Sequence, residues 1–131
     1  MFTDKFATRL NSFKSKWDST SEPTIKDLIK RVSGVKGLTH LDLNFPDHGK
    51  PSLKEAVNFA NECGLEINGL AMRYYTNPSF KLGAFTNPNK KVRQEAIDLT
   101  KEAIDCLRET NSNLLTIWLG QDGFDYGFQV D

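Results

Sequence analysis

Stretches typical of strands and stretches typical of helices alternate along this chain, and this alternation limits the available folds most. Strand-like patterns occupy residues 6–13, 38–45, 67–72 and 114–119. Between them, patterns with apolar residues three and four positions apart occupy residues 23–34, 52–64 and 92–107. The resulting βαβαβαβ order predicts an α/β fold with a parallel sheet joined by right-handed crossovers.

Two architectures are compatible with this order. One is a small doubly wound sheet with helices on both faces; the other is the N-terminal half, strands 1–4, of a (β/α)8 TIM barrel of roughly 250 residues. In the second strand His40, Asp42 and Asn44 would form a polar row on one face. Helices on both faces would bury this row without obvious partners, whereas a barrel interior can accept it. We therefore treat residues 1–131 as a single half-barrel domain.

The last apolar strand pattern, at residues 114–119, runs into a loop rich in Gln, Asp, Gly and aromatic residues. Ligands of α/β proteins collect at the carboxyl ends of parallel strands, so this loop is a candidate binding region. Alternation along the strand predicts that Thr116 and Trp118 face inward. The side chains expected to face the helices are Leu115, Ile117 and Leu119. Because the chain stops soon afterwards, at Asp131, we expect that it is part of a larger protein.

Composition excludes several classes of partner. Lys and Arg total 17, as do Asp and Glu, so no net charge attracts nucleic acid or a membrane surface. No apolar run is long enough to cross a bilayer, and the N-terminus lacks the layout of a signal peptide. A cytoplasmic location is the expectation, with no nucleic-acid or membrane partner.

Four segments at the expected strand ends resemble the xylose isomerase-like TIM barrels, a superfamily of sugar isomerases and epimerases that also contains the endonuclease IV enzymes. The segments are Phe6–Phe13, Leu41–His48, Gly69–Tyr75 and Ile117–Tyr126. The fourth is similar to the Trp-Gly-Gly-Arg-Glu-Gly pattern of xylose isomerases, because its strand ends in Trp and enters a Gly-polar-acidic-Gly-aromatic loop. It departs from that pattern at Leu119, in place of the first glycine, and at Gln121 and Asp122, in place of Arg and Glu.

The resemblance implies a metal-dependent enzyme that interconverts aldoses and ketoses, or sugar epimers. Such enzymes use one or two divalent ions, Mn, Mg or Co, to polarise neighbouring sugar oxygens. In the family the metal ligands come mainly from the fifth strand onward. This chain alone is therefore expected to bind no metal and to be inactive, while it contributes the wall against which the sugar substrate binds.

The resemblance also proposes roles for particular residues. His48, near the second strand end, is the catalytic candidate, since an imidazole can bind the ring oxygen or assist ring opening. Trp118 is the aromatic platform for the sugar's apolar face. The other candidates for the substrate-binding wall are Asn44, Phe13, Arg73, Tyr74, Gln121 and Asp122. Each of three candidates also has a purely structural explanation. His48 could be a solvated loop histidine, Trp118 could pack in the core, and Asp122 could belong to an Asp-Gly turn.

A different functional class is also open: a complete small α/β module that binds a small ligand or a protein partner without catalysis. The two hypotheses differ at the edges of the sheet. A half barrel leaves its edges open and predicts self-association, whereas a complete module predicts a monomer.

Overall fold

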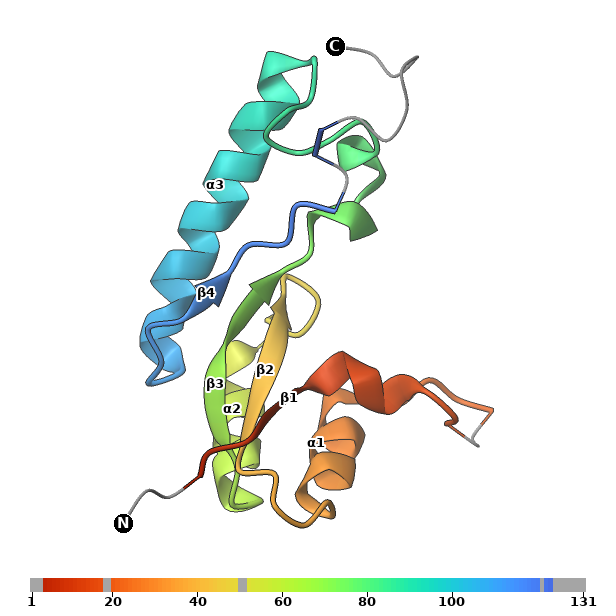
Figure 1. Cartoon of the computed structure of the whole chain (residues 1–131), viewed down its shortest axis with the longest axis vertical. Coiled ribbons are helices and arrows are strands. Elements are labelled where there is room, and N and C mark those ends of the chain that lie inside the picture. The colour runs from red at the N-terminus through yellow and green to blue at the C-terminus, as the bar shows by residue number, and fades with distance from the viewer. Residues whose placement is uncertain (1–3, 18–19, 50–51, 121, 124–131) are drawn as a thin grey trace.

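The computed structural model describes residues 4–17, 20–49, 52–120 and 122–123, and its elements follow the alternating order expected from the sequence (Figure 1). The strands are β1 (Ala7–Arg9), β2 (His40–Phe45), β3 (Glu66–Met72) and β4 (Leu115–Thr116). The α-helices between them are α1 (Ile25–Ser33), α2 (Leu53–Glu62) and α3 (Lys90–Cys106). Within this described part of the chain, no helix combines the length and apolar character needed to cross a lipid bilayer.

The strands form one parallel sheet in the order β1-β2-β3-β4. Strands that are consecutive in sequence are also neighbours in the sheet, so every crossover steps in the same direction. Right-handed crossovers of this kind place their helices on the same face of the sheet, and Figure 1 shows α2 behind β2 and β3. This arrangement is consistent with the N-terminal half of a TIM barrel and differs from a doubly wound sheet, which has helices on both faces.

The two faces of β2 have the chemical difference that the sequence predicted. Its core side contains the buried residues Leu41, Leu43 and Phe45, which pack with residues of α1 and α2. On the other side, the Asp42 carboxylate accepts a hydrogen bond from the Asn68 side-chain amide at 2.7 Å. Asn44 follows on the same side, near the carboxyl end of the strand. The helices therefore cover the apolar face of β2, and its polar face lies on the opposite side of the sheet.

Side-chain caps fix where the first two helices begin. Thr24 caps α1: its hydroxyl accepts from the backbone N–H of Asp27, whose carboxylate accepts from the backbone N–H of Thr24. The helix thus begins after Thr24, two residues later than the start of the pattern at residues 23–34. Ser52 caps α2, because its hydroxyl accepts from the backbone N–H of Glu55 at 3.3 Å.

The first strand is shorter than its sequence pattern predicted. We expected residues 6–13 to be extended, but β1 ends at Arg9 and the chain continues as the 3-10 helix η1 (Leu10–Lys14). The reason is Leu10, which is fully buried and belongs to the hydrophobic core. The helical turn that buries Leu10 also brings Asn11 and Ser12 to the carboxyl end of β1.

The fourth strand is also shorter than predicted, with only Leu115 and Thr116 in the ladder with β3. Leu115 packs against the core as expected. Ile117 and Leu119, which were also expected to face the helices, are 47% and 50% exposed, so no helix of the described residues covers them. They lie beyond the last paired residue, so the alternation of a regular strand no longer sets their direction.

Candidate functional site

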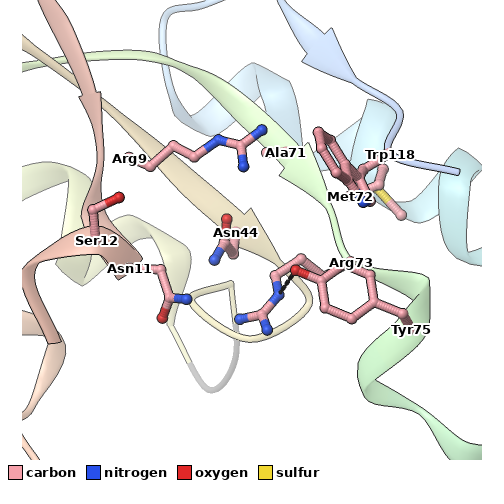
Figure 2. Close-up of a pocket in the computed structure, with 9 residues that line it drawn as sticks. All are labelled: Arg9, Asn11, Ser12, Asn44, Ala71, Met72, Arg73, Tyr75 and Trp118. Carbon is pink, nitrogen blue, oxygen red and sulfur yellow. Dashed lines mark hydrogen bonds between the residues drawn. The ribbon is translucent and has the colours of Figure 1, made fainter. Parts of the chain in front are cut away.

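A pocket of about 120 Å³ lies where the strands reach their carboxyl ends (Figure 2). Each strand contributes to it: Arg9 ends β1, Asn44 lies near the end of β2, Arg73 follows β3, and Trp118 follows β4. The other lining residues are Asn11, Ser12, Ala71, Met72 and Tyr75. Complete ligand sites usually have volumes of roughly 300–1,000 Å³. The pocket therefore has the size of one part of such a site.

Asn44 is the most buried polar residue that lines the pocket. It is 5% exposed, and Figure 2 shows its carboxamide between the side chains of Arg9 and Arg73. Within the described residues, no hydrogen bond joins this carboxamide to another protein group. Buried polar side chains nearly always have a partner in the protein, in ordered water or in a ligand. The carboxamide of Asn44 is thus available for a ligand in the pocket.

Arg73 is held in place by two neighbours. Its Nη1 donates to Oδ2 of Asp47 at 2.7 Å, and its Nε donates to the hydroxyl of Tyr75 at 2.9 Å. The guanidinium also lies over the Tyr75 ring, 4.9 Å from the ring centre. These contacts fix the direction of Arg73 and leave its Nη2 donors for other groups.

The guanidinium of Arg9 lies over the indole of Trp118, with its Cζ 5.2 Å from the ring centre. Trp118 is 49% exposed, so the indole still presents a surface to a ligand. Gly120 permits this position of the ring, because a Cβ at residue 120 would lie 2.7 Å from the indole Nε1. The pair joins the first and fourth strand ends across the pocket.

His48 does not line the pocket. Its side chain is buried, and Nδ1 accepts a hydrogen bond from the backbone N–H of Asn44 at 3.0 Å. Burial lowers the pKa of His48 to about 4; the charge of Asp47 opposes this shift, and the charges of Lys14 and Arg73 add to it. With Nδ1 accepting, the proton of the neutral ring is assigned to Nε2. The imidazole holds the turn after β2, and its catalytic role stays a prediction.

Phe13 and Tyr74 are not among the residues that line the pocket. Phe13 is partly buried against the hydrophobic core. Tyr74 is 2% exposed, and its hydroxyl is 2.5 Å from Oγ1 of Thr100 on α3. Burial raises the pKa of Tyr74. Its neighbour Tyr75 lines the pocket instead. Of the two predicted residues, Tyr74 therefore lies in the core and Phe13 packs against it.

Asp122 connects two loops and does not line the pocket. Its Oδ1 accepts from the backbone N–H groups of Ala84 and Thr86 at 3.0 and 2.7 Å. It also accepts from the Thr86 hydroxyl at 2.9 Å. Gln121, the other candidate from this loop, lies outside the described residues.

Arg9, Asn11 and Ser12 line the pocket but were not predicted from the sequence. The first strand was predicted to end at Phe13, four residues beyond its observed end at Arg9. Asn44 and Arg73 were identified as polar residues at a strand end. The same rule would have identified Arg9 if the buried Leu10 had been recognised as the start of a turn.

The described residues do not provide a set of metal ligands, since they contain no group of three or more His, Cys, Asp or Glu side chains close enough to share an ion. The Asp42 and Asp47 carboxylates accept hydrogen bonds from Asn68 and Arg73. A divalent ion in the full-length protein therefore stays a proposal, and we assign no chemical step to a metal.

Comparison with known proteins gives a partial similarity to a sugar isomerase. No protein-family model matches the chain. Xylose isomerase from Thermus thermophilus is 32% identical over 63 residues, which are 48% of this chain. The matched segment spans 16% of the length of that enzyme. At this coverage the similarity supports a relationship to the xylose isomerase-like superfamily at most, and it suggests a sugar isomerase-like origin for this chain.

Proposed function

We propose that this chain is the N-terminal part of a metal-dependent sugar isomerase or epimerase of the xylose isomerase-like superfamily, and that it carries one wall of the sugar site. The observation that carries the proposal is the meeting of Asn44, Arg73 and Trp118 in one pocket at the carboxyl ends of parallel strands. The partial match to a xylose isomerase supports the same reaction class, the interconversion of aldoses and ketoses.

The proposed wall has the chemistry that a sugar requires. The exposed indole of Trp118 offers an apolar surface for the C–H groups on one face of a sugar. The carboxamide of Asn44 can donate to one hydroxyl and accept from another. Arg73, fixed by Asp47 and Tyr75, has donors left for a further oxygen. Together these groups would orient the sugar for chemistry on the rest of the barrel, where the divalent ion would bind.

Nuclear magnetic resonance can test sugar binding at this wall, because the chain has two tryptophans. Trp17 lies under Arg31 in a separate groove and is the internal control. We expect titration with D-xylose or D-xylulose to shift the indole N–H resonance of Trp118 and not that of Trp17. Trp118→Phe and Trp17→Phe variants assign the two resonances. Equal shifts of both, or no shift at saturating sugar, would contradict the proposal.

A further inference from the structure

The charge of the pocket indicates the chemical class of its ligand more closely than the shape of the pocket does. Two guanidinium groups, those of Arg9 and Arg73, line it, and no carboxylate of the described residues does. Asp47 balances Arg73 from outside the lining through the 2.7 Å ion pair. Asp42 is aligned with Arg9 in the β1–β2 register, but its carboxylate accepts from Asn68. The pocket thus has a local excess of positive charge in a chain with no net charge.

Arg9 is the source of this excess. Its side chain is exposed, and within the described part of the chain the guanidinium interacts with the indole of Trp118 alone. An arginine that stacks on an aromatic ring keeps its N–H groups in the plane of the guanidinium, where they can bind a second group. Within the described residues no hydrogen bond uses the guanidinium donors of Arg9, so they can bind a ligand in the pocket.

The groups around the pocket are arranged for an anion. In Figure 2 the guanidinium of Arg9 lies on one side of Asn44 and that of Arg73 on the other, with Asn11 and Ser12 facing them from η1. Asn44 is 5% exposed, and its carboxamide bonds to no other group of the described residues, so the pocket also holds a neutral donor. Two planar guanidinium groups with neutral donors between them suit a phosphate or a carboxylate, each of which accepts paired N–H bonds.

Building on the proposed sugar-isomerase function, we propose that the sugar bound here carries an anionic group, a phosphate ester or a carboxylate, that lies between Arg9 and Arg73. Trp118 would contact the sugar carbons, and the two arginines would select for the charge. A neutral aldose or ketose would leave the excess charge of Arg9 unpaired.

Isothermal titration calorimetry of the full chain tests this proposal. The ligands are D-xylulose, D-xylulose 5-phosphate, D-xylonate and inorganic phosphate. We expect at least one of the two anionic sugars to bind about tenfold more tightly than D-xylulose, the size of one charge-assisted hydrogen-bonded contact. The phosphate ester and the sugar acid identify the anion. Inorganic phosphate alone should bind more weakly than the preferred sugar.

Variants then locate the effect. Arg9→Gln should abolish the preference for the anionic sugar, while Arg9→Lys, which keeps the charge but loses the paired donors, should retain part of it. Arg108→Gln removes the same charge from an exposed position on the 3-10 helix η4 (Leu107–Glu109) and should retain the whole preference. Because Arg9 is exposed, its variants should fold. The backbone amide resonances in a nuclear magnetic resonance spectrum of each variant verify this.

The possible failures are distinguishable. Equal affinity for neutral and anionic sugars, with the Trp118 resonance shifting for both, overturns the anionic substrate and leaves the sugar site in place. Inorganic phosphate that binds as tightly as the sugar phosphate overturns the proposal, since the sugar then contributes nothing. Absence of binding by every ligand contradicts both the anionic substrate and the proposed function.

Discussion

At the scale of single residues, His48 makes the stability of the fold depend on pH. Burial lowers the pKa of His48 from 6.5 to about 4, so between these values the unfolded chain takes up a proton that the folded chain does not. The free energy of unfolding should therefore be fully retained above pH 6.5 and should fall as the pH decreases toward 4. The full loss from this residue is about 3 kcal/mol. Urea denaturation at a series of pH values measures it.

The matched variant is His48→Asn, whose amide oxygen can accept the hydrogen bond from Asn44 without titrating. It should flatten the part of the pH profile between 6.5 and 4. A His48→Asn profile as steep as the parent profile would show that His48 is not the group responsible.

Residue-scale reasoning from the sequence identified part of the pocket. Asn44, Arg73 and Trp118 were predictable because each lies at or just after the end of an apolar strand pattern. The choice between Tyr74 and Tyr75 was not predictable, because both follow the same strand and only the direction of the 3-10 turn η2 (Tyr74–Thr76) separates them. In that turn Tyr74 enters the core and Tyr75 faces the pocket.

At the scale of elements, the approach of β4 to β3 depends on a glycine. The backbone N–H of Leu70 donates to the carbonyl oxygen of Leu114 at 3.1 Å, and a Cβ on Gly69 would lie 2.6 Å from that oxygen. Gly69→Ala should therefore push the two strands apart and lower the free energy of unfolding by about 1–3 kcal/mol, the usual cost of overpacking. Equilibrium denaturation measures the change.

Gly34→Ala is the control for this substitution. Gly34 caps the end of α1 at a φ of −75°, and a Cβ there would be 3.5 Å from its nearest neighbour, an ordinary contact. Both substitutions restrict the unfolded chain equally, so only the contact in the folded state differs. If Gly69→Ala were as stable as Gly34→Ala, the close approach of β4 would be disproved.

Element-scale prediction succeeded where local chemistry fixes an element and failed where distant contacts do. The three helices were predictable because periodic apolar residues and capping side chains lie within each segment. The length of β4 depends on where its pairing with β3 ends, at Ala71 and Thr116. That pairing joins residues far apart in the chain, so the apolar composition of residues 114–119 predicted a longer strand than the structure has.

At the scale of the whole molecule, the sheet has two edges. Within the described residues, β1 and β4 each pair with one strand only. Large apolar side chains lie near both edges: Phe6 beside β1 is 57% exposed, and Leu114, Ile117 and Leu119 around β4 are 44%, 47% and 50% exposed. Exposed apolar residues beside an unpaired strand are a template for association with another chain.

We therefore expect the isolated chain to self-associate through an open edge of the half barrel, so that two half barrels pair. Sedimentation velocity over a wide range of protein concentrations measures this association. Replacing both Ile117 and Leu119 by Lys should shift the chain toward the monomer, because two charges would have to be buried in the contact. Ile104→Lys is the control, since Ile104 is equally exposed, at 51%, but lies on α3. A parent chain that stays monomeric at every concentration would instead favour a complete small module whose edges need no partner.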